Sequence, residues 1–132
     1  MLALLRATAA DPQLTLRVLK CCRFGCFMHE SNRQAFVKGG LIGMCLTAAE
    51  THFAVDQAVT ESLKCLKILT KDDDPRVPFG KGNDHASMIC KDENGLERLL
   101  KVLGECYKGE DVVSAGTAAA LFSTLSMLVR LQ

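Results

Sequence analysis

The stretch NRQAFVKGGL at residues 32–41 decides how this 132-residue chain is built. Its first part favours a short helix over 33–38, which the Gly39-Gly40 pair then stops, because glycine readily adopts the backbone conformation that ends a helix. Apolar residues at three-to-four spacing continue over 41–51. The stretch therefore predicts two short helices separated by a glycine turn.

Helical periodicity also dominates the rest of the chain. The Asp11-Pro12 pair is a typical helix opening, since aspartate caps free N–H groups and proline fits the first turn. We expect further helices over residues 2–9, 12–30, 55–71, 85–91, 96–107 and 112–131, with a break at 31–32, a loop over 76–84 and a turn at 108–110. No segment alternates strictly between apolar and polar residues, so no sheet is predicted. The expected fold class is all-α.

Composition narrows the class of function. Lysine and arginine number 16 against 15 aspartates and glutamates, a net charge of +1 that lacks the basic excess of a nucleic-acid binder. No run approaches the roughly 18 apolar residues of a membrane span, and the start has too short an apolar stretch for a signal peptide. We therefore expect neither nucleic acid nor membrane as a partner. The expected location is the cytoplasm, with the nucleus as the second option.

The order short helix, short helix, long helix occurs more than once. The tripeptide LKC at 19–21 recurs at 63–65, about 44 residues later, and Arg33 is echoed by Arg76. A helical unit that repeats every roughly 40–47 residues is typical of armadillo and HEAT arrays. One such unit cannot bury its apolar stripe alone, so neighbouring units must stack.

The junction at 32–41 resembles the pattern N-R-x-x-I/L-V-x-A-G-G-I/L, which joins one armadillo repeat to the next. Cys65-Leu66 matches the Ala-Leu pair of the helix before the next junction, and the string DDDPRVPFG at 72–80 resembles one particular branch of the armadillo repeat family. The resemblance implies a right-handed α-solenoid of short-short-long helix units, whose third helices line a concave, peptide-binding groove. It implies no enzymatic activity.

On this basis residues 1–132 form a single armadillo repeat array. A partial repeat covers 1–31, a full repeat covers 32–74, and a repeat with an inserted loop near 77–90 covers 75–132. We expect the array to be incomplete at both ends, with further armadillo repeats of the parent chain beyond it, because solenoids need polar end repeats for solubility.

Importin-type armadillo repeats hold a basic peptide with a Trp–Asn ladder on their third helices. That ladder is absent here, since the matching positions are Cys21 and Gly25, Lys64 and Ile68, and Ser123 and Met127. Lys64 close to Lys67 repels a basic ligand, so an acidic or mixed protein partner is expected. By helical register, the groove residues expected to contact it are Arg17, Cys21, Phe24, Met28, Thr60, Lys64, Lys67, Lys71, Ser123 and Met127.

The junction that begins at Arg76 is about a dozen residues longer than the one that begins at Arg33. Insertions in repeat proteins collect on one face and frequently contact partners. We therefore expect partner contacts from the inserted loop, at Arg76, Phe79, Lys81 and His85. The alternative is a loop that packs on its own chain, with Phe79 against a neighbouring helix.

Cys22, Cys26 and His29 share one helical face at i, i+4 and i+7, a set that points to metal binding or a redox response. Armadillo repeats place core residues at the two cysteine positions, so we expect buried thiols in a reducing compartment and neither metal nor cofactor. The three aspartates at 72–74 lack the spacing of a calcium loop and are expected to be solvated acids or caps near Arg76.

The sequence offers no recognisable catalytic site. No group of nucleophile and base can be assembled from it, and the glycines near Lys81 lack the spacing of a phosphate-binding loop. The prediction is a non-enzymatic scaffold that binds a partner segment along its groove. Two alternatives remain: structural spacer repeats within a longer chain, and a metal- or redox-responsive module built on the cysteines and His29.

Overall fold

The computed structural model describes residues 1–107 and 115–131, and within them every regular element is helical. In chain order these elements are α1 (Leu2–Ala7), α2 (Pro12–Cys26), α3 (Glu30–Lys38), α4 (Leu41–Thr51), α5 (Asp56–Leu69), α6 (Gly82–Ser87), the π-helical turn η1 (Met88–Asp92), α7 (Gly95–Tyr107) and α8 (Ala115–Arg130). No strand occurs in the described ranges. The all-α prediction is confirmed.

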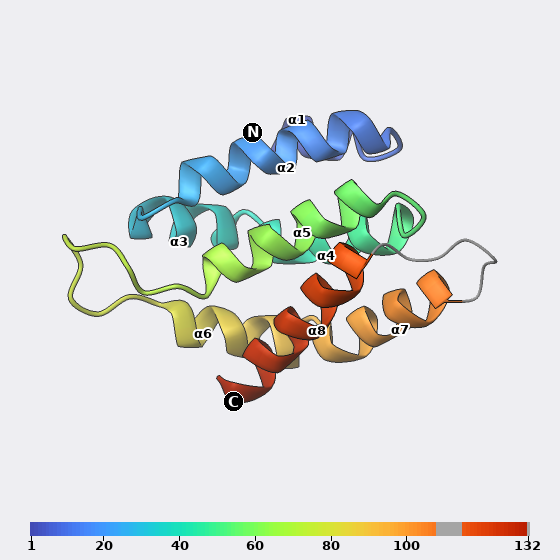
Figure 1. The fold of residues 1–132 in the computed structure, drawn as a ribbon. Coiled ribbons are helices and arrows are strands. Elements are labelled where there is room, and N and C mark those ends of the chain that lie inside the picture. Colours follow the sequence, from blue (N-terminus) through green and yellow to red (C-terminus); the bar gives the residue numbers. More distant parts are fainter. Residues whose placement is uncertain (108–114, 132) are drawn as a thin grey trace.

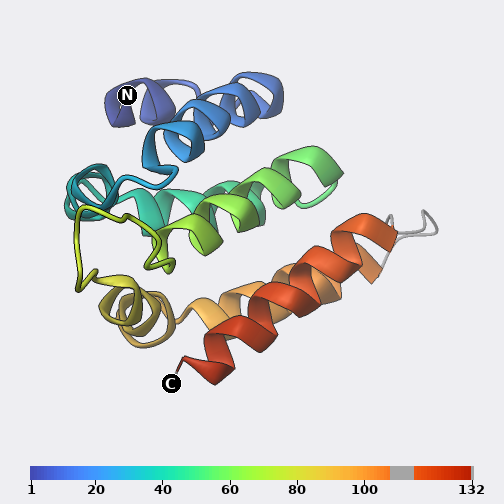
Figure 2. The same ribbon diagram turned by 60° about the vertical axis from the view of Figure 1, so that its left-hand side comes forward.

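Equivalent helices of successive units lie side by side. The long helices α2, α5 and α8 follow one another in that order, with α5 packed between the other two (Figure 1). The shorter helices α1, α4 and α7 contact one another in the same order. Figure 2 shows the result as three tiers, formed by α1–α2, by α3–α5 and by α6–α8. Each tier buries its apolar side chains against the next.

Helix α5 is the centre of the core because it packs against α2, α4 and α8. Its buried positions include every apolar residue from Ala58 to Leu69. The large aliphatic side chains that are fully buried in and around it are Leu19, Leu41, Leu46, Leu63, Leu66, Leu69, Ile89, Leu99, Leu121 and Leu128. Burial of one such side chain stabilises a fold by about 1.5–3 kcal/mol, so the stacking of tiers supplies the main driving force. None of the described helices is both long and apolar enough to span a bilayer.

Several predicted helix limits agree with the structure. The helix predicted over 41–51 is α4, and the limits of α5 and α7 differ from the predictions by no more than two residues. Helix α1 ends two residues early, and α6 begins at Gly82 rather than at 85. The predicted turn at 108–110 and the first residues of the helix predicted over 112–131 lie outside the described residues.

The predicted helix over 12–30 is wrong at its end. Helix α2 stops at Cys26, and Met28 takes a left-handed backbone conformation with φ of 49°. Helix α3 then begins at Glu30, whose N–H donates to Asp74 Oδ2 at 2.9 Å. The His29 ring also accepts from the Asn32 N–H at 3.2 Å. The break lies earlier than predicted because a carboxylate from a distant part of the chain caps the new helix.

The fully buried Arg33 joins two tiers at their ends. Its guanidinium donates to the Cys26 carbonyl at 2.8 Å, at the end of α2, and to the Lys71 carbonyl at 2.9 Å, just after α5. An ion pair with Asp73 and a Glu30 carboxylate 3.7 Å away balance its charge. Helix ends carry carbonyls without a helical partner, so one side chain satisfies two ends at once. Arg33 therefore sets how α2, α3 and α5 meet.

Replacing Arg33 with alanine should lower the free energy of unfolding by about 3 kcal/mol, because the buried carbonyl of Cys26 and the Asp73 carboxylate lose their partner. Urea denaturation followed by circular dichroism measures the change. The matched control is Lys38→Ala, an exposed site on the same helix, where a change within about 0.5 kcal/mol is expected. Equal losses in the two variants would contradict the role given to Arg33.

Candidate functional site

Polar contacts connect α2, α5 and α8 along one face. Arg23 of α2 forms an ion pair with Glu61 of α5, a carboxylate that is almost fully buried. Between α5 and α8, Lys67 Nζ donates to Ser123 Oγ at 2.7 Å. Further contacts join the hydroxyls of Thr60 and Thr117 at 3.4 Å, and Thr70 Oγ1 with Met127 Sδ at 3.2 Å. The three helices therefore form one cross-linked surface.

A hollow of about 370 Å³ opens between these helices toward their N-terminal ends. Its lining mixes polar, charged and small residues: Leu16, Lys20, Asp56, Gln57, Thr60, Glu61, Lys64, Gly116 and Thr117. Because the Glu61 carboxylate is already paired with Arg23, the other charges of the lining are the cations Lys20 and Lys64 and the carboxylate of Asp56. The hollow can receive one side chain of a polar or acidic segment.

Four lysines form what we call the lysine face: Lys20 of α2, Lys64 and Lys67 of α5, and Lys71, which follows the end of α5. None of them makes an ion pair with an acid in the described part of the chain. The pKa of Lys67 is lowered, first by its partial burial and second by the nearby charge of Lys71. Cations that repel one another and form no ion pair with an acid favour a negatively charged ligand.

The contacts and the lining of the hollow place five of the ten predicted groove residues on this side: Thr60, Lys64, Lys67, Ser123 and Met127. Thr60, Lys67 and Met127 are half-buried and make the contacts between α5 and α8 described above. The others are exposed: Arg17, Cys21, Phe24, Met28, Lys64, Lys71 and Ser123. Met28 differs from the prediction in one respect, since it belongs to the turn after α2 and not to the helix.

The inserted loop divides into exposed and buried residues. Arg76, Phe79 and Lys81 are exposed, and Phe79 keeps 87% of its surface accessible. The alternative in which Phe79 packs on a neighbouring helix is therefore wrong. His85 is instead buried, with its ring Nδ1 2.7 Å from the Leu69 carbonyl oxygen. The expectation that His85 contacts a partner is corrected: it holds α6 against the end of α5.

The three aspartates are not simply solvated, which corrects part of the prediction. Asp74 accepts from the Glu30 N–H, from the Arg76 N–H at 3.0 Å and from the Arg76 side chain at 2.9 Å. The Arg76 side chain first, and these two N–H groups second, hold the pKa of Asp74 well below its usual range. Asp72 accepts from the Gly80 N–H at 3.0 Å, while Asp73 pairs with Arg33. The predicted cap and the proximity to Arg76 are confirmed.

Cys22 and Cys26 are buried thiols. Burial, and less strongly the neighbouring Cys65, raise the pKa of Cys22 to about 11 and that of Cys26 to about 12. A raised pKa disfavours the thiolate, which is the form that acts as a nucleophile. The His29 ring caps α3, and the described residues contain no group of three or more His, Cys, Asp or Glu placed to hold a metal.

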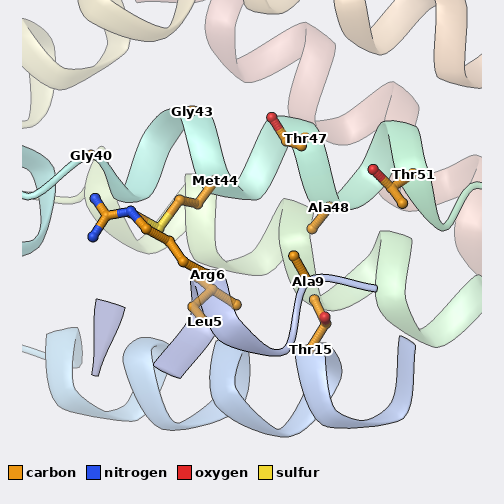
Figure 3. Close-up of a pocket in the computed structure, with 10 residues that line it drawn as sticks. All are labelled: Leu5, Arg6, Ala9, Thr15, Gly40, Gly43, Met44, Thr47, Ala48 and Thr51. Carbon is orange, nitrogen blue, oxygen red and sulfur yellow. The ribbon is translucent and has the colours of Figure 1, made fainter. Parts of the chain in front are cut away.

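Sequence reasoning missed a second hollow, which lies between α1 and α4 and measures about 400 Å³ (Figure 3). Its walls are mainly apolar or small: Leu5, Arg6, Ala9, Thr15, Gly40, Gly43, Met44, Thr47, Ala48 and Thr51. Helix α1 ends at Ala7, whereas α4 continues to Thr51, so part of α4 has no helix across from it. No motif marks such a mismatch in helix length; only the small residues of α4 hint at it.

Stacked units whose equivalent helices contact one another in order define a helical repeat protein. The chain is homologous to armadillo repeat-containing protein 6, and its stacked helices fit that homology. It is 39% identical over 129 residues to that protein from Pongo abelii and 37% identical over 128 residues to the one from Homo sapiens. Each alignment covers 97% of this chain and 25% of the relative.

A homologue from Drosophila melanogaster is 30% identical over 128 residues, which cover 86% of this chain and 27% of that protein. The chain thus spans about a quarter of the length of the curated relatives it matches. No family model matches the chain. No solved structure matches it either. The armadillo resemblance drawn from residues 32–41 and 72–80 is confirmed by these relatives.

Under native conditions we expect a thiol reagent such as Ellman's reagent to label Cys21 rapidly, because Cys21 is exposed. The buried thiols of Cys22, Cys26, Cys45 and Cys65 should react only after unfolding. Stopped-flow absorbance measures the fast phase, and Cys21→Ser is the control that should remove most of it. Rapid native labelling of Cys22 or Cys26, or zinc that remains bound to the purified chain in equal amount, would contradict this account.

Proposed function

We propose that this chain is part of a non-enzymatic, armadillo-type right-handed α-solenoid that binds an acidic segment of a protein partner. The observation that carries the proposal is the lysine face, four cations without an acidic partner among the described residues. We assign the segment to the surface of α2, α5 and α8, which corresponds to the concave groove of an armadillo array. The homology supports the repeat architecture, and the charges support the choice of ligand.

The spacing on α5 suits an extended ligand. Lys64 and Lys67 stand at i and i+3, so they occupy one side of the helix, and Lys71 follows the end of the helix at Leu69. Helices α2 and α8 pack on either side of α5 (Figure 2). An extended peptide segment can therefore lie across all three helices. Carboxylates of the segment would meet these ammonium groups in succession, while one side chain enters the hollow beside Lys20.

Energetics require several contacts at once. An exposed ion pair contributes only about 0.2–1 kcal/mol, so no single lysine accounts for specific binding. The lysine face acts mainly by raising the rate at which an acidic segment associates, and added salt lowers this rate. It also excludes basic ligands. Burial of side chains in the hollow and beside Phe24 then supplies the apolar part of the affinity.

We extend the proposal to organisation and location. We keep the units 1–31, 32–74 and 75–132 that the sequence predicts; α4 and α5 lie wholly within the middle unit, and α3 begins two residues before it, at Glu30. We place the protein in the cytoplasm or nucleus, since its seven cysteines are free thiols, as expected in a reducing compartment. Catalysis forms no part of the proposal, because the homology is to repeat proteins named for their repeats.

Selection from a random peptide library displayed on phage tests the proposal. We expect the peptides enriched on the chain to be acidic, and we expect the Lys64→Glu/Lys67→Glu variant to lose at least about tenfold in affinity for them, because two attractions become repulsions. Fluorescence anisotropy at several salt concentrations measures affinity, and circular dichroism checks the fold.

The matched control is Lys38→Glu/Lys101→Glu, which makes the same change in net charge at exposed sites on α3 and α7. This variant should bind the selected peptides about as tightly as the unaltered chain. Enrichment of basic peptides, or equal losses in the two variants, would contradict the proposal. A complete lack of enrichment would favour the spacer alternative.

A further inference from the structure

The hollow between α1 and α4 (Figure 3), which we call the α1–α4 hollow, exists because the two helices differ in length. Helix α1 ends at Ala7 and the chain soon enters α2, while α4 continues to Thr51. Gly40, Gly43 and Ala48 carry little or no side chain, so they leave the space open. The volume of about 400 Å³ lies within the range of roughly 300–1,000 Å³ found for small-molecule pockets.

Hydrogen bonds hold the turn after α1, which closes one end of the α1–α4 hollow. The Thr15 hydroxyl of α2 donates to the Thr8 carbonyl at 2.9 Å. The ring Nε2 of the buried His52, just after α4, lies 2.8 Å from the Ala9 carbonyl oxygen. The turn is thus tied to α2 and to the end of α4. Because these walls are already held, a ligand would lose less binding energy to ordering them.

The lining of the α1–α4 hollow combines mainly apolar or small walls with one charge. Arg6 is the one charged side chain among the described residues that line it. Figure 3 shows its guanidinium near Gly40 at one end, with Ala9 and Ala48 toward the other end. A ligand that fills the hollow therefore meets a cation at one end. Over the rest of its length it meets mostly hydrocarbon.

The charge of Arg6 is not neutralised within the described chain. Its Nη2 donates to the Gly39 carbonyl at 3.0 Å, and it forms no ion pair with a described acid. Glu93 lies close to Gly43, but its carboxylate is paired with Arg98 at 3.3 Å. A guanidinium has several N–H donors in one plane, which match the two oxygens of a carboxylate. Arg6 can therefore bind a carboxylate and keep its bond to Gly39.

The apolar part of the lining favours a hydrocarbon tail over a peptide. A buried peptide backbone brings N–H and C=O groups that need hydrogen-bond partners. The Thr15 hydroxyl already donates to the Thr8 carbonyl, and the Thr47 hydroxyl accepts from Arg98 at 3.2 Å. An aliphatic tail needs no such partners, and its burial against apolar walls is favourable.

We propose that the α1–α4 hollow binds an aliphatic monocarboxylate, with its carboxylate on Arg6 and its tail along α4 toward Ala48. One cation faces one anion, and the apolar walls receive the tail. The proposed site shares no residue with the lysine face or with the hollow beside it. It therefore goes beyond the proposed binding of an acidic segment, and either site can fail without the other.

Calorimetric titration of the purified chain with sodium octanoate tests the proposal. We expect one saturable site and an affinity that rises about fourfold for each CH₂ group from hexanoate to octanoate. Octanol and octylammonium, which lack the anion, should bind at least about tenfold more weakly than octanoate. Acetate, which is the head group without a tail, should show no measurable binding.

Two substitutions separate the head of the ligand from its tail. Arg6→Gln should weaken octanoate binding by about tenfold or more and leave octanol binding unchanged, because only the partner of the carboxylate is lost. The matched control is Arg17→Gln, the same change at an exposed site on α2, which should bind octanoate normally. Ala48→Leu fills the hollow and should remove the binding of both compounds, with circular dichroism as the check of folding.

Methyl NMR locates the bound tail without any substitution. The methyl group of Met44, which lines the α1–α4 hollow, should shift as octanoate is added. The methyl group of Met127, whose sulfur contacts Thr70 between α5 and α8, should not shift. This comparison distinguishes the proposed site from simple attraction of a carboxylate to the lysine face.

Three results would overturn the proposal. The first is the absence of saturable octanoate binding. The second is a shift of the Met127 methyl group with none at Met44, which would place the ligand on the lysine face. The third is equal octanoate affinity of the folded Arg6→Gln and Arg17→Gln variants. These results decide the proposal even where Ala48→Leu does not fold.

Discussion

The buried guanidinium of Arg33 is the constraint on which the rest of the structure depends. It lies in the junction between two tiers, where the end of α2 and the end of α5 both leave carbonyls without helical partners. One planar group with several donors satisfies both, and Asp73 and Glu30 balance its charge. A buried charge is tolerated only when it is paired and hydrogen-bonded, so these groups must meet in one geometry. That geometry sets how α2 and α5 stack.

The same junction separates acidic side chains, which pair within the chain, from the lysines of the lysine face, which form no ion pair with a described acid. Asp73 and Asp74, which follow α5 in sequence, turn inward to Arg33, Arg76 and the start of α3, and Glu61 pairs with Arg23. The lysines of α5 are then left without internal acids, and the loop after the aspartates is held open with Phe79 outward. A chain with a net charge of only +1 in this way presents a locally cationic face and an uncharged aromatic projection. Two chemically distinct surfaces arise from one internal network.

Prediction from sequence succeeded where the deciding contacts are local. The end of α3 and the start of α4 depend on Gly39-Gly40, and the end of α4 follows from spacing within the helix, so these limits were predictable. It failed where a partner comes from far along the chain. Helix α3 begins at Glu30 because Asp74 caps it, and His85 is buried because the Leu69 carbonyl accepts its ring. Neither pairing leaves a signal in the local pattern.

The sequence by itself determined the all-α class, the repeated helical unit and the relationship to armadillo repeat-containing protein 6, because periodicity, glycine stops and junction motifs are properties of neighbouring residues. The register of the exposed lysines on α5 follows from the same periodicity. Only the tertiary structure decided which acids those lysines could reach, that Phe79 is exposed, that His85 is buried, and that a hollow opens between α1 and α4. Each of these features depends on which helix ends and side chains come close together when the helices stack. The order of residues along the sequence does not specify those distances.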